Sequence, residues 1–551
     1  MIESGWQSGP PVAPRRSNLL RLGVVLLAIL LVASGGFALL VDRQSPSGPS
    51  AGASIPPGTE LTIAGSAPSS WDPAVIGDAG SASMLSQVFE GLTALDARNA
   101  VQPALASSWT VEDGGKRVVF DLRAGITFSD GRAITAVDVV ASWLRVIDPA
   151  HPSPLASLLT DVTGVKAYLA GSGPVGDIGL QAHGNQVVVT FRRPAAYFVS
   201  AAASPTLAVL PPDFPTAAAT ATGSDLPSDL VVSGAYVPSD QTPTSIHLTA
   251  NPRYWAGAPP IGNIQVITDL QGRSPVDAFQ SGDLDYTPIG SADAAWIRYD
   301  RDLGPQLRRS ASLSVEYYGF DTTRPPFDSA DVRRAFAMAV DWRRLVVLDD
   351  PTAEPATSLV PVGIEGRSAG DFLPPHDVTA AKAALASAGY PNGKGFPTLT
   401  IVTSGGEFEE AVAQQLKDAL AIDVHVEVMA FDEYTTRLEQ DPPQMWALTW
   451  IADYPHPQDF LGLLLETGSV SNYGRWSNPQ YDAALDAAAA TEDPAAQAQQ
   501  YAAAQQILRD QVPLIPLRYG EDWALSRAGL LGATETGVGF VRYAGLAWGN
   551  R

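Results

Sequence analysis

No cysteine occurs among the 551 residues of the chain. This absence excludes disulfide bonds, thiolate metal sites, cysteine nucleophiles and a lipid-modified N-terminal cysteine. Basic residues are also scarce, since 35 Lys and Arg stand against 58 Asp and Glu and leave a net charge of −23. Nucleic-acid binding requires a basic surface that neutralises phosphates, so the charge balance argues against a nucleic-acid partner.

The residue patterns of common catalytic and metal sites are missing or lack their structural context. Two G-x-S-x-G matches occur, GPSAG at 48–52 and GRSAG at 366–370, but prolines follow each within a few residues instead of the helix that a nucleophile elbow requires. The G-x-G-x-x-G match at 171–176 is interrupted by Pro174, with no apolar strand before it. The histidines are scattered, without the spacing of zinc ligands: His151, His183, His247, His376, His425 and His456. We therefore expect no metal, no cofactor and no enzyme activity, with an extracytoplasmic hydrolase as the less favoured alternative.

One long segment without charge lies near the N-terminus, at 22–41. At 1.5 Å per residue its length matches the roughly 30 Å of a bilayer core. Arginines precede it, which predicts a cytoplasmic 1–21 and an extracytoplasmic remainder. A cleaved signal peptide is the alternative, but the run is long and no clear cleavage site follows, so we favour a single-pass membrane anchor. The small, polar and proline-bearing stretch 42–58 is typical of a linker.

The remaining chain is too long for one ordinary core, so two or three domains are expected. Its composition, 45% apolar and 17% charged, is globular. Among the expected helices, 135–147 begins with a capping Thr135 and Asp138, and its predicted apolar face consists of Val137, Val140, Leu144 and Ile147. A second helix is expected over 329–346, and two helices separated near Pro494 over 481–510.

Strands and helices alternate from 379 to 452, which favours a largely parallel sheet with helices on its faces. Ligands of such sheets bind beyond the carboxyl ends of the strands. Asp453 follows the last strand of this series, in the sequence WIADYPHPQDF at 450–460. From the residues alone, Asp453 is open to two interpretations: a cap of the turn before Pro455, or a charge presented to a ligand.

A series of motifs resembles the extracytoplasmic solute-binding proteins of the peptide/nickel (oligopeptide/dipeptide) class, which feed ABC importers. The motifs follow one another in family order from 71 to 517 and include WDPAV (71–75), VFEGLTALD (88–96), NPRYW (251–255), WIADYPHPQDF (450–460), NYGRWSNPQYD (472–482) and VPLIPL (512–517). The resemblance covers nearly everything after the linker. It departs at His456, where the family often has an acid; we expect that difference to alter only a loop surface.

The resemblance implies an α/β, bilobed periplasmic-binding-protein fold of type II, of the three-domain peptide-binding class, here with an N-terminal membrane-spanning helix. The implied boundaries are 59–318 for lobe I, including a small domain at about 88–195, 319–516 for lobe II, and 517–551 for the return to lobe I. A hinge between the lobes is expected at Tyr318, Gly319, Leu517 and Arg518.

The resemblance also implies a binding site, in which Asp453 contacts the α-amino group of a bound peptide. An ammonium group taken out of water requires such a partner, because desolvation otherwise costs several kcal/mol. The other candidate ligand-binding residues are weaker, each with a structural alternative: Trp450, Ile451, Ala452, Ala79, Gly80 and Arg437. Trp450 could fill the core instead, Ala79 and Gly80 could form a plain loop, and Arg437 could be a solvated helix residue.

The function implied by the resemblance is that of a membrane-tethered, monomeric substrate-binding protein. It would capture oligopeptides or related solutes and deliver them to an ABC permease, whose ATPase acts in trans. The alternative within the same fold is a non-peptide solute such as a nickel chelate, haem or an oligosaccharide.

Overall fold

The computed structural model describes residues 60–549, except 216–224, 368–369, 371, 406 and 540. The expected membrane anchor at 22–41 and the linker at 42–58 lie outside the described residues. Within the described ranges, none of the helices combines the length and the apolar character needed to cross a membrane. The description below concerns the unit that begins at Pro57.

The largest sheet of the described chain has eleven strands. Its strands lie in the order β15 (Val424–Val428), β14 (Leu399–Thr403), β16 (Met445–Ile451), β12 (Leu307–Phe320), β17 (Leu514–Ser526), β11 (Tyr286–Ile289), β1 (Glu60–Ala64), β10 (Asn263–Ile267), β9 (Ser245–Ala250) and β8 (Tyr236–Gln241), while β13 (Glu354–Pro355) pairs with β17. β14 pairs in parallel with β15 and β16, which confirms the parallel arrangement expected for this region. The whole sheet is mixed, because β12 is antiparallel to both of its neighbours.

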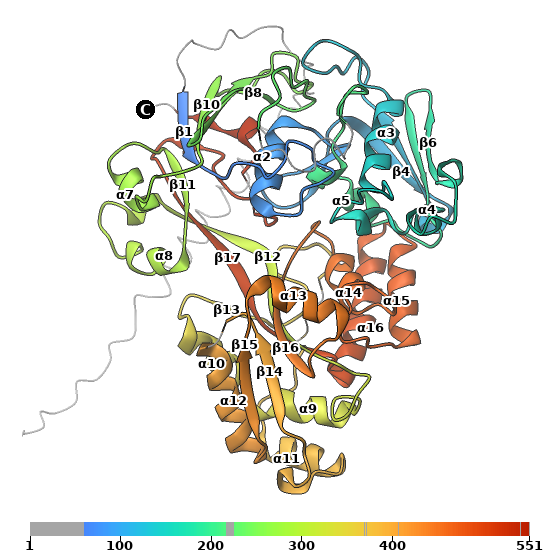
Figure 1. Ribbon diagram of the computed structural model, residues 1–551, viewed down its shortest axis with the longest axis vertical. Helices are drawn as coiled ribbons and strands as arrows, with labels where there is room; N and C mark the ends of the chain where they lie inside the picture. Colours follow the sequence, from blue (N-terminus) through green and yellow to red (C-terminus); the bar gives the residue numbers. More distant parts are fainter. Residues whose placement is uncertain are drawn as a thin grey trace, which may run out of the picture. The chain divides into compact units, whose positions relative to one another are not determined.

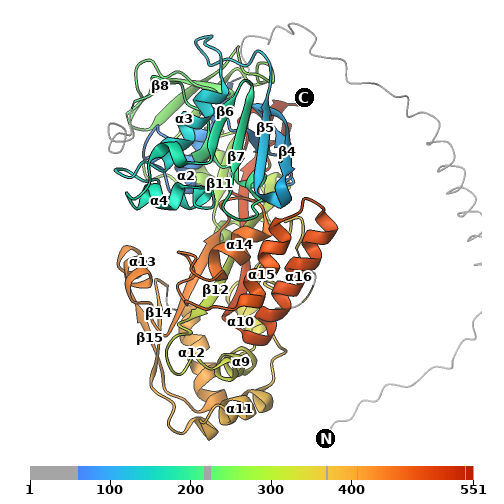
Figure 2. The ribbon, with the colours of Figure 1, turned by 90° about the vertical axis from the view of Figure 1, so that its right-hand side faces the viewer.

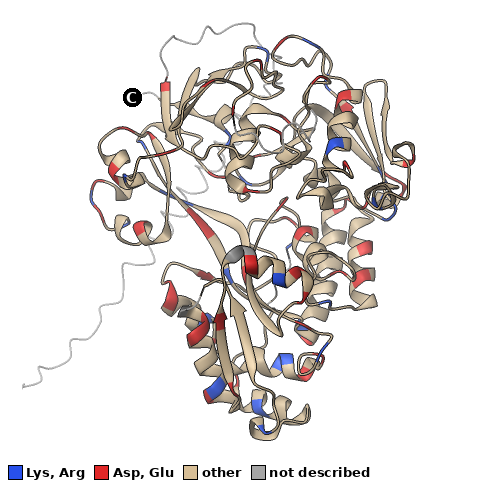
Figure 3. Ribbon diagram, in the orientation of Figure 1, with Lys and Arg blue, Asp and Glu red and all other residues tan. Residues whose placement is uncertain are grey.

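Two long strands, β12 and β17, connect two groups of elements (Figure 1). In the first group, 307–311 of β12 pairs with 521–525 of β17. In the second group, 315–319 pairs with 514–519; the register shifts between the two stretches and again between Glu316 and Tyr317. We call the elements of 60–311 and 521–549 the first group, and those of 315–519 the second group. Acidic positions recur on the helices of both groups (Figure 3).

A second sheet belongs to the first group and contains β4 (Ala106–Glu112), β5 (Arg117–Leu122), β7 (Gln186–Thr190) and β6 (Leu180–His183), in that order. Its core is formed with α3 (Ala136–Val146) and α5 (Phe198–Ala201), and the rings of Phe120, Trp143 and Phe198 pack edge to face. The capping box of Thr135 and Asp138 that begins α3 is confirmed.

Helices cover both faces of the parallel strands in the second group. Alternate residues of β14 point to opposite faces, as the strand period requires: Ile401 packs among α9 (Ala330–Ala339), α11 (Val378–Ser387) and α12 (Glu407–Leu420), and Val402 packs against α13 (Phe431–Gln440). A further layer consists of α14 (Pro457–Leu465), α15 (Pro479–Ala489) and α16 (Pro494–Gln511), so the expected break near Pro494 is confirmed.

The remaining α-helices in the described ranges are short. Four belong to the first group, α2 (Ala79–Val88), α4 (Val165–Leu169), α7 (Pro275–Gln280) and α8 (Ser291–Ile297), and α10 (Trp342–Asp349) belongs to the second. The first group also contains the small strands β2 (Thr93–Leu95), β3 (Val101–Pro103), β18 (Leu530–Leu531) and β19 (Ala547–Trp548).

Two expectations about helices were wrong in part. Of the predicted apolar face of α3, Ile147 is fully buried, Val140 and Leu144 are half-buried against the core, and Val137 is 66% exposed. The fully buried residues of the helix also include Val139, Trp143 and Val146, which face the second sheet. The expected helix over 329–346 is two helices, α9 and α10, since the backbone is extended at Val340 and Asp341 caps a new helix.

The two groups also contact each other away from the long strands, where α14 and α15 lie below the second sheet (Figure 2). The backbone N–H of Ala196 donates to the carbonyl of Ala489 at 3.0 Å. Arg193 bridges Asp161 of its own group and Glu466 of the other, with N–O distances of 2.8 Å. The rings of Tyr197 and Tyr454 are stacked, with centroids 6.0 Å apart. These contacts hold the strand-to-helix turn after β16 against the first group.

Substitution of Gly319 by alanine tests the packing of β12. An added Cβ would overlap the buried indole of Trp446, whose ring has no free space to move. We expect Gly319→Ala to lower the free energy of unfolding by about 1–3 kcal/mol, measured by urea denaturation. Gly290→Ala is the control, because a Cβ there meets no atom within 4 Å. Equal stability of the two variants would contradict this packing.

Candidate functional site

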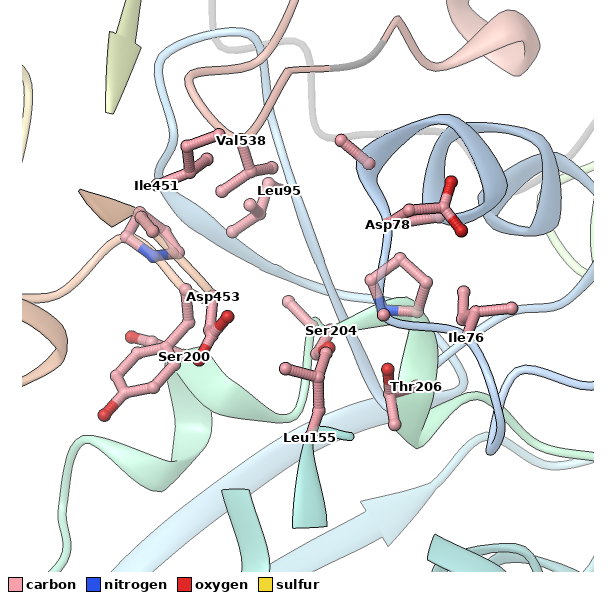
Figure 4. A pocket seen from close by; sticks show the side chains of 18 residues that line it. Ile76, Asp78, Leu95, Leu155, Ser200, Ser204, Thr206, Ile451, Asp453 and Val538 are labelled. Carbon is pink, nitrogen blue, oxygen red and sulfur yellow. The ribbon is translucent and has the colours of Figure 1, made fainter. Parts of the chain in front are cut away.

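A cavity of about 200 Å³ lies where the end of β16 meets the segment before α2. Figure 4 shows Ile451 and Asp453 on one side of it and Ile76 and Asp78 on the other. One wall is therefore supplied by the second group and the opposite wall by the first. The stretch 203–206 forms the floor between them.

Pairing of β16 with β12 determines where Asp453 emerges. The two strands are in register up to Ile451, opposite Ser314, and the N–H of Ala452 still donates to the carbonyl of Leu313 at 2.9 Å. The chain then leaves the sheet, and α14 begins at Pro457 with the side chain of His456 at its N-cap. Asp453 is thus held in a short turn between a paired strand and a capped helix, at the carboxyl end of the strand.

The carboxylate of Asp453 accepts no hydrogen bond from any described residue and forms no ion pair with one, although it is half-buried at the cavity. Burial raises its pKa to about 6. A buried carboxylate without a donor is costly, since desolvation is not offset by any partner. The arrangement is that of a group whose partner comes from outside the chain.

The second acid of the cavity, Asp78, has all its partners within the chain. Asp78 caps α2 by accepting from the Ser81 N–H at 2.8 Å, and its other oxygen accepts from the hydroxyls of Ser81 at 2.7 Å and Ser69 at 3.1 Å. Burial opposes the ionised form, but the hydrogen bonds from Ser81 outweigh it and lower the pKa of Asp78. Asp78 is therefore a structural cap that adds negative potential to the cavity.

The rest of the lining is apolar or neutral. Aliphatic side chains come from both groups: Leu95, Leu155, Ile451 and Val538. Hydroxyl groups of Ser200, Ser204 and Thr206 supply neutral donors and acceptors, and no lysine or arginine lines the cavity. A ligand that carries a positive charge and an adjacent apolar group fits this lining.

The structure brings together some of the expected site residues. Ala79, Ile451, Ala452 and Asp453 all line the cavity. Gly80 follows Ala79 in the first turn of α2 and does not line it.

Two other candidates lie elsewhere. Trp450 points away from the cavity, and its indole N–H donates to Asp459 at 2.9 Å. Arg437 lies on α13 and pairs with Glu427 at 3.2 Å, outside the lining of this cavity.

The four expected hinge residues lie in the second group, beside a register shift of the β12–β17 ladder between Glu316 and Tyr317 that leaves Leu517 without a partner residue. Tyr318 and Leu517 are buried in the core of this group, Gly319 packs on an indole, and Arg518 pairs with Glu316. A longer break in the ladder lies nearer to the first group, at 312–314.

Sequence reasoning missed two residues behind Asp453. His456 is not a surface residue of a loop: its ring lies between Tyr197 and Tyr501, at centroid distances of 6.1 and 5.8 Å, and its Nδ1 accepts from the Gln458 N–H. The expectation for His456 was therefore wrong, because three elements converge on it. Asp459 is fully buried, and its position three residues after the N-cap was the available signal.

Metal binding is not indicated within the described ranges, where no group of three or more His, Asp or Glu residues is arranged to hold an ion.

The family of the chain follows from comparison with known proteins. The family model described as "Bacterial extracellular solute-binding proteins, family 5 Middle" matches residues 100–472, about two thirds of the chain. The chain belongs to this family. Its members are extracytoplasmic solute-binding proteins, and the chain has their mixed α/β periplasmic-binding-protein fold.

Several named relatives are similar over most of their length. The probable deoxycholate-binding periplasmic protein YgiS of Escherichia coli is 30% identical, over 82% of this chain and 86% of the relative. The oligopeptide-binding protein OppA of Bacillus subtilis is 25% identical, over 86% of this chain and 90% of the relative.

Solved structures show the same fold. The murein tripeptide binding protein MppA of Escherichia coli superposes with a TM-score of 0.71 at 24% identity, covering 90% of this chain and 100% of MppA. OppA of Burkholderia pseudomallei superposes with a TM-score of 0.72 at 25% identity, over 90% of this chain and 100% of OppA.

The raised pKa of Asp453 predicts a pH-dependent stability. The folded-state pKa is about 6, against about 4 in the unfolded chain. Between these values the folded state keeps a proton that the unfolded state has released, so the free energy of unfolding falls as pH rises from about 4 to about 6. Asp453→Asn removes this penalty and should stabilise the protein at pH 7 by of order 1 kcal/mol.

Urea denaturation at pH 4.5 and pH 7 measures this effect. Asp177→Asn is the matched control, because Asp177 is exposed on a surface turn. A midpoint for Asp453→Asn below that of the wild type at pH 7 would contradict the account of Asp453.

Proposed function

We propose that the chain is the membrane-tethered substrate-binding protein of an ABC transporter, and that it captures short peptides by their free amino terminus. One observation carries the proposal: the half-buried carboxylate of Asp453 faces the cavity without a partner in the described chain. Membership of a solute-binding family and relatives whose names state peptide binding support it.

The chemistry of the site favours an ammonium group over other ligands. A cation next to Asp453 offsets the desolvation of the carboxylate, and the carboxylate offsets that of the cation. Backbone groups at the end of β16 are available to pair with the ligand main chain in the manner of an added strand. Small Ala452 and Ala79 leave room for close approach from both sides.

The size of the cavity favours a short ligand or the first residues of a longer one. Its volume of about 200 Å³ lies below the roughly 300–1,000 Å³ typical of small-molecule sites. The aliphatic side chains of Leu95, Leu155 and Val538 lie where the side chain of a first ligand residue would be accommodated. We therefore propose a preference for a small apolar residue next to the amine.

Capture would involve closure of two lobes, lobe I at 59–318 and 517–551 and lobe II at 319–516, with a small domain at about 88–195. Lobe I supplies the wall at 76–79, and lobe II supplies Asp453. We propose that bending occurs where the ladder of β12 and β17 is irregular, at 312–314 and between 316 and 317. The second irregularity adjoins the expected hinge at Tyr318, Gly319, Leu517 and Arg518. The three-domain, type II class of the family is part of the proposal.

The proposed location rests on the sequence of the N-terminal region, and the proposed partners rest on the family. An uncharged run at 22–41 would anchor a monomer in the membrane with the binding unit outside the cytoplasm. Delivery requires a permease and an ATPase in trans. The protein itself would perform no catalysis.

A second candidate function is binding of an apolar non-peptide solute in the same cavity. The aliphatic lining and the 30% identity to a protein named for deoxycholate binding favour it. An anionic amphipath would place its charge near Asp453 and Asp78, which repel it, so we prefer the cationic ligand.

Calorimetry with trialanine and its N-acetylated form tests the proposal. Trialanine should bind the wild type, and Asp453→Asn should weaken that binding by about 30-fold or more, because the ammonium loses a desolvated partner. N-acetyltrialanine should bind weakly to both proteins, with little difference between them. The exposed Asp177→Asn should leave the affinity for trialanine unchanged.

Three outcomes would contradict the proposal. Equal loss of both peptides in Asp453→Asn would remove the role of the amine. Binding of deoxycholate without binding of any peptide would favour the second candidate. Turnover of a peptide by the wild type would make the protein an enzyme.

A further inference from the structure

A second carboxyl group, that of Asp459, lies directly behind Asp453 and outside the cavity. Asp459 is fully buried in the first turn of α14. Its Oδ2 accepts the indole N–H of Trp450 at 2.9 Å, and both of its oxygens lie 3.3 Å from the backbone N of Asp453. Asp459 therefore contacts both sides of the turn, through the side chain of Trp450 and through the backbone N–H of Asp453.

No described cation pairs with either carboxylate. Burial raises the pKa of Asp459 well above its usual range, and the charge of Asp453 raises it further. Burial likewise raises the pKa of Asp453. A fully buried carboxyl group that contacts the backbone of a second, half-buried acid cannot ionise at low cost while that acid is charged. Titration of one is therefore linked to titration of the other.

The ionisable side chains that contact the pair keep one protonation state near neutral pH, so only the pair itself titrates there. Burial lowers the pKa of His456, the N-cap of α14, to about 3, so its ring is neutral above that pH. Burial raises the pKa of three surrounding tyrosines, so they remain protonated: Tyr197, Tyr454 and Tyr501.

Two further ionised groups face the same region without contacting the pair. Across the interface, Asp161 is ionised and paired with Arg193, which lowers its pKa against the effect of burial. Across the cavity, the hydrogen bonds of Asp78 keep it ionised, since its pKa is lowered.

We propose that Asp459 is the positioning residue of the binding carboxylate, that Asp459 and Asp453 share one proton in the free protein, and that a bound ligand cation expels this proton to solvent. The proposal deepens the function proposed above and rests on it for the identity of the cation. In the free protein, the proton stays on the fully buried Asp459, whose ionisation is opposed by burial and by the charge of Asp453. The positive charge of the arriving ammonium offsets the repulsion between the two carboxylates, so the proton on Asp459 leaves.

This linkage makes the affinity for the ligand depend on pH. Because the ligand binds the fully ionised pair, affinity for an amine rises as pH increases through the upper titration step of the pair. Above about pH 8 the α-amino group of the ligand itself loses its proton, and affinity falls again. The protein would therefore bind its ligand less well in an acidic surrounding.

The first test needs no ligand. The indole N–H of Trp450 reports the charge on its acceptor, so its ¹⁵N–¹H resonance, assigned by comparison with Trp450→Phe, should shift with a midpoint between pH 5 and 7. In Asp459→Asn, the acceptor does not titrate, and most of the shift should be lost. The exposed Asp177→Asn should behave as the wild type. A wild-type resonance that is constant from pH 4 to pH 8 overturns the shared proton.

The second test measures protons exchanged on binding, by calorimetry with trialanine at pH 6 in buffers of different ionisation enthalpy. The wild type should release a substantial fraction of one proton per peptide. Asp459→Asn keeps an oxygen acceptor for Trp450, so at pH 8 its affinity should lie within about threefold of the wild type, with clearly less proton release at pH 6. Asp459→Ala removes the acceptor, so it should bind about tenfold or more weakly at every pH.

The outcomes distinguish this inference from the function on which it rests. Equal proton release by the wild type and Asp459→Asn, at retained affinity, overturns the linkage. Wild-type affinity of Asp459→Ala, confirmed as folded by urea denaturation, overturns the positioning role. Absence of trialanine binding together with a normal Trp450 titration overturns the peptide function and supports the shared proton.

Discussion

The pairing of β12 with both of its neighbours is the constraint on which the rest of the structure depends. β12 joins β17 on one side and β16 on the other, so one strand both connects the two groups of elements and determines where β16 ends. The last paired residue is Ile451, two residues before Asp453. A one-residue slip would move the Trp450 side chain to the opposite face of the strand and separate it from Asp459. The position of the Asp453 carboxylate is therefore a consequence of sheet register.

The acidic residues that lower the stability of the fold at the candidate site are the same residues that we propose to serve binding. Asp459 is fully buried and Asp453 is half-buried, and neither has a basic partner among the described residues. Such groups lower stability and persist where they serve binding. The surrounding contacts offset this cost, since Tyr454 stacks on Tyr197 and His456 caps α14. The turn is consequently rigid before a ligand arrives, which reduces the entropy lost on binding.

Local sequence patterns predicted much of the fold, but at the candidate site they predicted Asp453 and not the residues packed behind it. The alternation from 379 to 452 and the capping box at Thr135 depend on neighbouring residues, and both are confirmed. The exposed Val137 shows the limit of periodicity, because the choice of the buried face depends on a sheet that is distant in sequence. The position of Asp453 at the end of a strand was predictable. The packing of His456 between two tyrosines and the burial of Asp459 were not, since their environments are built by Tyr197, by α16 and by β16 together.

The central claim is that a ligand cation is bound by Asp453 in the cavity between the end of β16 and the start of α2. A crystal structure of the binding unit with a short free-amine peptide tests it most directly. The account predicts the peptide nitrogen at about 2.8–3.0 Å from a carboxylate oxygen of Asp453, with the first side chain against Leu95, Leu155 or Val538. A peptide bound with its amine on Asp78, or at a site away from this cavity, would contradict it.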